Sequence, residues 1–280
     1  MNQLKNYVLL LTIIILGTIL NAQNKVFDVE IKGTGNPILL FPGFTCPGDV
    51  WDGVVKELSN DYECHVFTFA GFGGMPAIKK PWLPKIKEAI SFYISEEQLK
   101  APTLIGHSLG GTLALWLATE KKHNFNKIIV VDALASTGAL MMPNFDANSI
   151  TYDNPYSQQM LNMDENSFKA MADQMAKGMS LNQEKQDLIT KWMVESDRET
   201  YIYGYTDLLK LDLREDLTEI KTPVIILAAT QPYGLGTVRK TYAKQYEKLK
   251  DYNIKFAENS AHFIMFDQPK WLIEAIISEL

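Results

Sequence analysis

The sequence predicts an α/β protein with a mostly parallel central sheet, helices on both faces of that sheet, and a helical cap insertion. Short β-rich runs alternate with helical patterns, and one long interval without strands breaks the alternation. The repeated strand–helix–strand order places neighbouring strands parallel and the helices on the sheet faces. The 280 residues, 46% of them hydrophobic, suit one large domain or two small ones and exclude a disordered, collagen-like or coiled-coil chain.

In chain order, the predicted strands are short apolar or β-branched runs. They are Val26–Lys32, Pro37–Phe41, Cys64–Phe69, Thr103–Gly106, Lys127–Val131, Pro223–Ala229 and Ile254–Ala257. The helices predicted between or after them are Val50–Leu58, Leu83–Gln98, Thr112–Glu120, Val238–Leu249 and Trp271–Leu280. These elements assign residues 23–133 and 212–280 to the sheet-containing core.

Residues 134–211 are the interval without a predicted strand, and they contain eight of the eleven methionines. Two patterns in it are typical of capping boxes, Ser180-x-x-Gln183 and Ser196-x-x-Glu199. Apolar residues at helical spacing also occur there: Phe168, Met171, Met175 and Met179. We therefore expect a helical cap whose methionines either pack in a core or line an adaptable apolar pocket.

The first 22 residues have the features of a secretory signal peptide. Lys5 precedes an uncharged apolar run from Tyr7 to Leu20, and polar residues follow. As a helix this run would span roughly 21 Å, which is short of a bilayer core of about 30 Å. Cleavage after Ala22 would leave 280 − 22 = 258 residues. We expect export to a periplasm or beyond, with an uncleaved anchor as the alternative.

Charge and composition limit the expected partners. The formal charge is −6, from 27 Lys and Arg against 33 Asp and Glu, and no long basic run occurs. We therefore expect no nucleic-acid partner, no anionic membrane surface and no membrane insertion of the mature chain. No Cys and His residues have metal-ligand spacing, and Gly71, Gly73 and Gly74 lack the rest of a phosphate loop, so we expect neither metal nor cofactor. The oligomeric state stays open.

The strongest chemical motif is Gly106-His107-Ser108-Leu109-Gly110-Gly111. It directly follows a predicted strand and opens a helix that begins near Leu109. A serine at such a sharp strand-to-helix turn has strained backbone geometry and lifts its hydroxyl into a cleft, and the glycines avoid clashes across the turn. The positive end of the following helix also points at this position. The motif therefore predicts that Ser108 is a nucleophile.

Four segments resemble those of the α/β-hydrolase-fold superfamily, and the likeness extends from Val26 to the C-terminus. They are Phe41-Pro42-Gly43-Phe44, Gly71-Phe72-Gly73-Gly74, Gly106–Gly111, and Ala261-His262-Phe263 with Asp267-Gln268-Pro269. The family often has His-Gly in the first segment, where Pro42 here replaces the His and keeps the tight turn. The resemblance implies a capped hydrolase similar to serine esterases.

A serine hydroxyl needs a base within hydrogen-bond reach, and the sequence contains four histidines. His107 is held in the turn beside Ser108, His65 begins a strand, and His123 lies in a polar loop. His262 follows the last predicted strand and precedes the final helix, where the resemblance places the base. We expect His262 to be this base, and the alternative is a packed loop histidine.

The acid of the expected triad has more than one candidate. Many relatives carry it after the strand that corresponds to Pro223–Ala229, but residues 229–234 contain no carboxylate. Some relatives carry it at the end of the preceding strand, where Asp132 stands, and a carboxylate at that tip faces the same crevice as the serine. We therefore expect Asp132 to be the acid. The alternatives are a structural role for Asp132, another carboxylate such as Glu258 or Asp207, and a dyad without an acid.

Acyl transfer also requires donors for the developing oxyanion. The resemblance implies that these are the backbone N–H groups of Phe44 and Leu109. Phe44, Trp51, Phe72 and the cap would shape an apolar pocket, unless Trp51 and Phe72 are core residues.

Together these residues predict an exported serine hydrolase that cleaves small or medium carboxylic esters through an acyl-enzyme on Ser108. The expected partner is a small-molecule, ester-like substrate. One alternative is an amidase or peptidase with the same triad. Another is a non-catalytic ligand-binding protein that keeps the serine turn, because a fold alone does not establish function.

Overall fold

The computed structural model describes residues 25–142 and 144–280 of the chain. The predicted signal peptide, residues 1–22, lies outside the described residues. Within the described ranges, no helix is long and apolar enough to cross a membrane.

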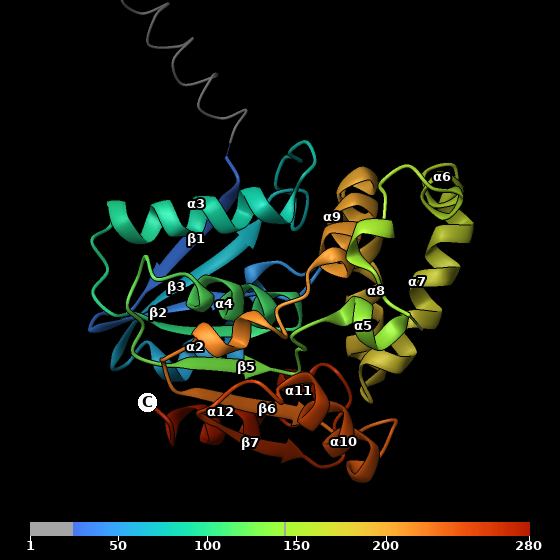
Figure 1. Cartoon of the computed structure of the whole chain (residues 1–280). Coiled ribbons are helices and arrows are strands. Elements are labelled where there is room, and N and C mark those ends of the chain that lie inside the picture. The colour runs from blue at the N-terminus through green and yellow to red at the C-terminus, as the bar shows by residue number, and fades with distance from the viewer. Residues whose placement is uncertain (1–24, 143) are drawn as a thin grey trace, which may run out of the picture.

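A seven-stranded sheet runs through the centre of the protein (Figure 1). Its strands are β1 (Phe27–Lys32), β2 (Asn36–Phe41), β3 (Tyr62–Phe69), β4 (Thr103–His107), β5 (Ile128–Val131), β6 (Val224–Ala229) and β7 (Tyr252–Ala257). Their order is β1-β3-β2-β4-β5-β6-β7, in which β1 pairs antiparallel with β3 and the other five pairings are parallel. The predicted fold class, a mostly parallel sheet within an α/β protein, is confirmed.

Helices cover both faces of the sheet because side chains alternate between the faces along each strand. In β2, Leu39 and Phe41 belong to one buried cluster, whereas Ile38 and Leu40 belong to another. The first cluster includes residues of α3 (Leu83–Glu96), α4 (Leu109–Thr119) and α10 (Leu235–Gln245). The second includes residues of α2 (Asp52–Leu58), α11 (Ile264–Asp267) and α12 (Pro269–Ile277). Two apolar layers therefore hold the strands that carry the site.

In the part of the chain that the structure describes, five α-helices between β5 and β6 form the cap. They are α5 (Thr137–Met141), α6 (Pro155–Leu161), α7 (Glu165–Met179), α8 (Gln183–Glu195) and α9 (Arg198–Lys210). Figure 1 shows them gathered at one end of the sheet. This is the end at which β4 and β5 finish, since the residues that follow those strands line a cavity together with α7, α8 and α9.

The helices α8 and α9 begin later than the capping-box patterns predict. The side chains that cap them are Asn182 and Asp197, each accepting a hydrogen bond from the backbone N–H three residues further on. Ser180 instead donates to the Asp267 carboxylate (2.6 Å), and Ser196 donates to a carbonyl of the preceding helical turn. The prediction of serine caps is wrong because Asn and Asp cap helices as well as Ser does, and both stand just after the serines.

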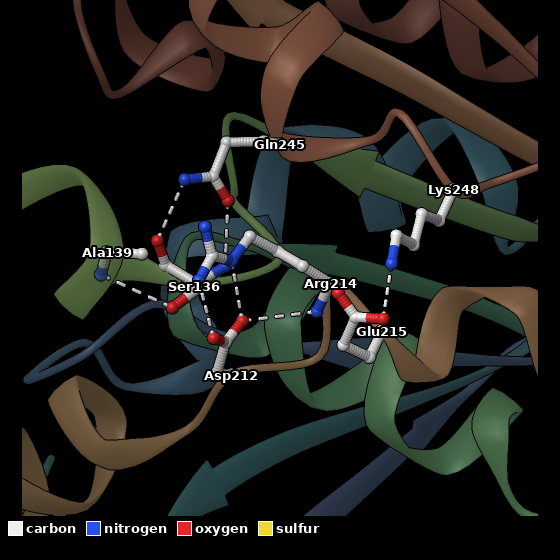
Figure 2. A network of polar contacts seen from close by, with 7 residues as sticks. All are labelled: Ser136, Ala139, Asp212, Arg214, Glu215, Gln245 and Lys248. Atoms are coloured by element: carbon white, nitrogen blue, oxygen red, sulfur yellow. Dashed lines mark hydrogen bonds and ion pairs between the residues drawn. The ribbon is translucent and has the colours of Figure 1, made fainter. Parts of the chain in front are cut away.

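Hydrogen bonds and an ion pair fix the segments by which the chain enters and leaves the cap (Figure 2). Buried Gln245 of α10 forms two hydrogen bonds with the backbone of Ser136, accepting from its N–H (2.8 Å) and donating to its carbonyl (2.9 Å). Asp212, on the returning segment, forms a two-point ion pair with Arg214 (2.8 and 2.7 Å). The N–H of the intervening residue, Leu213, donates to the carbonyl of Ala135 (3.0 Å). We call this cluster the neck of the cap.

Candidate active site

Ser108 stands at a strained turn between β4 and α4. Its φ of 52° and ψ of −122° lie outside the regions that non-glycine residues usually adopt. The turn closes tightly, because a Cβ on Gly106 would lie 2.1 Å from the Gly110 carbonyl oxygen, and one on Gly110 would lie 2.3 Å from the Phe41 carbonyl oxygen. Both glycines are therefore required by space, and together they fix the serine at the end of the strand.

The structure brings His262 and Asp132 together. His262 Nδ1 lies 2.7 Å from Asp132 Oδ2. Asp132 follows β5, and its other oxygen accepts hydrogen bonds from the backbone N–H of Ala229 (2.8 Å) and from the Tyr242 hydroxyl (2.9 Å). Burial and the charge of Asp132 raise the pKa of Tyr242, so this hydroxyl stays a donor. The carboxylate is thus held by three hydrogen bonds and orients one imidazole.

Ser108 and His262 line the same cavity. In the described part of the chain, no direct hydrogen bond joins the serine hydroxyl to the imidazole. Catalytic hydrogen bonds are often long in enzymes without substrate and tighten in the complex. Proton transfer from Ser108 to His262 is therefore a proposed step, and it requires the two side chains to come within hydrogen-bond distance of each other.

The other carboxylates considered from the sequence lie elsewhere. Asp207, on α9, accepts hydrogen bonds from the backbone N–H groups of Trp82 (2.6 Å) and Leu83 (3.0 Å), at the start of α3. It also accepts one from the Tyr152 hydroxyl. Asp207 therefore ties the cap to the core. Glu258 is exposed, and neither carboxylate lines the cavity.

His107 has a place in the site that sequence reasoning missed. Its Nε2 donates to the carbonyl oxygen of His262 (3.0 Å), and the two rings lie 4.7 Å apart. Burial lowers the pKa of His107 well below its usual value, so the ring is neutral, and the carbonyl acceptor requires the proton on Nε2. We infer that His107 fixes the backbone of the residue expected to act as base. This role follows from a contact between His107 and His262, which stand 155 positions apart in the sequence, so no local pattern indicates it.

Asp267 connects the cap with the loop that carries His262. One carboxylate oxygen accepts from the Ser180 hydroxyl (2.6 Å) and the Leu181 N–H (2.9 Å), between α7 and α8. The other accepts from the N–H of Ala261 (2.8 Å), the residue before His262. A single side chain thus positions both the end of α7 and the histidine loop.

The expected oxyanion donors are the backbone N–H groups of Leu109 and Phe44. Leu109 is the first residue of α4, so its N–H has no acceptor within the helix. Phe44 follows Gly43, where a Cβ would lie 2.6 Å from His107 Nδ1. Neither N–H donates a backbone hydrogen bond within the described ranges. Phe44 lines the cavity, and so does Ser108, the residue before Leu109.

A cavity of about 760 Å³ lies between the cap and the carboxyl ends of the strands β4, β5 and β6. We call these strand ends, with Ser108, Asp132 and Ala229, the sheet edge. Phe44 lines the cavity, but Trp51 and Phe72 are fully buried and do not, so they are core residues. Cap methionines line it instead, which favours the pocket interpretation of the sequence for these members: Met141, Met175, Met179 and Met193. Across the described ranges, no group of three or more His, Cys, Asp or Glu side chains is placed to hold a metal ion.

A family model described as the alpha/beta hydrolase family matches residues 38–275. This protein belongs to the alpha/beta hydrolase family. The match covers the four segments that carried the resemblance, from the last residue of β2 to the start of α12, and it identifies the chain as a hydrolase.

The relatives of this alpha/beta hydrolase are named for several reactions. The N-formylmaleamate deformylase of Pseudomonas putida is 21% identical over 242 residues, covering 84% of this chain and 85% of the deformylase. The pimeloyl-[acyl-carrier protein] methyl ester esterase of Vibrio cholerae is 25% identical over 248 residues, covering 85% and 88%. The crystal structure of the enol-lactonase from Burkholderia xenovorans LB400 matches with a TM-score of 0.73 at 15% identity, covering 90% and 95%, and supports the fold alone.

Proposed function

We propose that this protein is a serine hydrolase that cleaves small or medium carboxylic esters through an acyl-enzyme on Ser108. The observation that carries the proposal is the 2.7 Å contact between His262 Nδ1 and Asp132 Oδ2 in the cavity that Ser108 also lines. The strained turn at Ser108 supports it, because such strain is typical of a nucleophile held at a strand end. The relatives named as an esterase and a deformylase support hydrolysis at an acyl carbon.

The proposed reaction has two halves. The Ser108 oxygen attacks the ester carbonyl carbon while its proton moves to His262 Nε2, and the N–H groups of Phe44 and Leu109 bind the oxyanion. As the tetrahedral intermediate collapses, the bond to the alkoxy oxygen breaks, and His262 gives that oxygen the proton. Water then attacks the acyl-enzyme, with His262 again taking and returning the proton, and the carboxylic acid leaves.

Asp132 serves this cycle by orienting the ring. A carboxylate on Nδ1 keeps the proton there, leaves Nε2 free to accept, and stabilises the imidazolium that forms. The two additional hydrogen bonds to Asp132, from Ala229 and Tyr242, restrict it to this orientation.

Labelling with a fluorophosphonate probe tests the proposal. The probe should label Ser108 of the native protein, as located by mass spectrometry, and the variants Ser108→Ala and His262→Ala should not be labelled. Ser91→Ala is a matched control, since Ser91 is a buried serine that contacts His123 outside the cavity. A folded but unlabelled native protein would leave the non-catalytic ligand-binding alternative.

The deformylase relative keeps amide cleavage as a second candidate function. The same triad geometry can cleave amides. The test compares p-nitrophenyl butyrate with butyryl p-nitroanilide, which share the acyl group. A much higher kcat/KM for the ester supports the esterase proposal, and equal values would favour an amidase.

Export is part of the proposal and is supported by the sequence of residues 1–22, with its lysine, apolar run and polar end. Expression of the full chain in a bacterium with a periplasm tests it. The mass of the periplasmic protein should correspond to cleavage after Ala22, and a full-length protein retained in the membrane fraction would support the uncleaved anchor.

A further inference from the structure

The described residues that line the cavity beside Ser108 do not supply a permanent positive charge. Among its lining residues there is neither Lys nor Arg, and the carboxylate present is Asp132, which is engaged with His262. Cations on the cap are held outside the cavity. The guanidinium carbon of Arg198 lies 3.7 Å from the centre of the Phe168 ring, and this side chain donates to two backbone carbonyls. The Nζ atom of Lys210 lies 5.3 Å from the centre of the Tyr152 ring.

The cap side of the cavity is lined by methionines and by tyrosines whose hydroxyls are uncharged. The hydroxyls of Tyr201 and Tyr205 contact the sulfur atoms of Met175 (3.8 Å) and Met141 (3.2 Å). Burial raises the pKa of both tyrosines, so they are neutral groups. Thioether side chains conform to apolar chains of varied shape but offer no counter-charge to an anion.

Besides Asp132 and His262, the side of the cavity away from the cap carries uncharged polar side chains. They include Gln231, in the segment between β6 and α10, and Thr237 and Thr241 on α10. Amide and hydroxyl groups can solvate a neutral polar group of a substrate. They do not neutralise a carboxylate, which would also be repelled by Asp132.

We propose that this site selects esters whose acyl group is neutral and apolar, of medium length, and rejects acyl groups that end in a carboxylate. The proposal rests on the ester hydrolase function proposed above and adds the charge class of its substrate. A carboxylate moved from water into this cavity would lose hydration without gaining an ion pair, which is strongly unfavourable. A cavity of about 760 Å³ falls within the range that accommodates medium-sized ligands.

Three esters with the same leaving group test the charge selection. They are p-nitrophenyl hexanoate, the p-nitrophenyl methyl diester of adipic acid, and p-nitrophenyl hydrogen adipate, which carries a terminal carboxylate at pH 7.5. We expect kcat/KM for the charged adipate to be at least about 100-fold below that for its neutral methyl ester. The value of kcat/KM for the hexanoate should be similar to that for the neutral methyl ester. A difference below about tenfold would overturn the proposal.

A variant with an added cation sharpens the test. Met175 lines the cavity and is 38% exposed, so a lysine there can reach the cavity while its stem packs on the cap. Met175→Lys should narrow the ratio between the neutral and charged adipates by about tenfold or more, and the matched neutral variant Met175→Gln should not. Equal narrowing by both variants would contradict electrostatic selection.

Binding to the Ser108→Ala variant separates this proposal from the esterase proposal. Calorimetry with the same three esters measures affinity without acyl transfer. Tighter binding of the two neutral esters supports the charge selection even if the native protein hydrolyses none of them, in which case the esterase proposal alone fails. Equal binding of all three esters overturns the charge selection, whether or not hydrolysis occurs.

Discussion

The two regions that enclose the cavity are built in different ways. At the sheet edge, Asp132 is fixed by three hydrogen bonds and Ser108 by a backbone turn that admits no side chain at its glycines. Across the cavity, the cap presents methionines and tyrosines whose contacts are mostly apolar. Directional hydrogen bonds impose one geometry, whereas apolar contacts of flexible side chains permit several.

This difference separates two properties of the protein. The sheet edge determines which bond can be attacked, because it sets the relative positions of nucleophile, base and acid. The cap determines which molecule can be held there, through its volume and its lack of charge. Substitutions at the sheet edge should therefore affect kcat most, and substitutions in the cap should affect selectivity among esters.

The largest effect is expected from Asp132→Asn. The amide can still accept from the Ala229 N–H, so the fold should persist, but it favours the wrong tautomer of His262. Loss of the triad acid lowers kcat by about 10⁴-fold in the type case. We expect a loss of several orders of magnitude in p-nitrophenyl ester hydrolysis with an unchanged circular dichroism spectrum.

Asp207→Asn is the control for this variant, since Asp207 is a buried carboxylate of the cap that does not line the cavity. It should retain far more activity than Asp132→Asn. A rate near that of the native protein for Asp132→Asn would remove Asp132 from the triad and support a dyad.

A smaller loss is expected from Asp267→Ala, which lies at the boundary between the two regions. The substitution frees the N–H of Ala261 and releases the loop that carries His262. Displacement of a catalytic group by about 1 Å can cost about 10²-fold, so we expect kcat to fall by about 10–100-fold with a smaller change in KM.

Ser180→Ala is the matched control for Asp267→Ala. It removes the hydroxyl hydrogen bond from the cap to Asp267 and leaves the bonds from the N–H groups of Leu181 and Ala261. If both variants lose activity equally, the cap contact and not the histidine loop is what Asp267 serves.

The contrast between features set by a local pattern and features set by packing explains what could be predicted from the sequence. Ser108 was predictable because its turn needs a local pattern of glycines, and Asp132 because the tips of parallel strands share one edge. The caps of α8 and α9 were predicted at the wrong residues, since Asn182 and Asp197 compete locally with the nearby serines. Such competition is decided by where the whole helix packs, which a short pattern does not contain.

Contacts between distant segments could not be predicted from residue types. His107 and His262 are both visible in the sequence, but the hydrogen bond between them depends on how β4 and the loop after β7 meet. The charge class of the cavity was equally hidden, because residues 134–211 contain five lysines and one arginine as well as methionines. Only the fold shows that none of these lysines, nor the arginine, is among the residues that line the cavity.

The neck of the cap offers a test of stability that does not involve the catalytic groups. Gln245→Ala removes two hydrogen bonds and leaves the buried N–H and carbonyl of Ser136 without partners. We expect the free energy of unfolding to fall by about 1–3 kcal/mol, measured by urea denaturation. Gln158→Ala, at an exposed position of α6, should change it by less than about 0.5 kcal/mol. Equal effects would show that the neck contributes little.

The smallest effect is expected at the ion pair of the neck. Although burial opposes it, the hydrogen bonds and charge of Arg214 hold the pKa of Asp212 below its usual value. A carboxyl whose pKa is lowered on folding adds stability above its unfolded pKa, and this stability is lost as the pH falls through the folded value. Both side chains are partly exposed, so Asp212→Asn should reduce stability at pH 7 by about 1 kcal/mol or less.

The difference between the native protein and Asp212→Asn should shrink as the pH falls below the ordinary pKa of Asp, about 4, because the stability linked to a lowered pKa is lost as the native carboxyl becomes protonated at still lower pH. A double-mutant cycle with Arg214→Ala isolates the pair from the other contacts of Asp212. If the difference stays constant as the pH falls, the ion pair does not hold the neck, and the hydrogen bonds of Gln245 and of the Leu213 N–H are the contacts of the neck that fasten the cap.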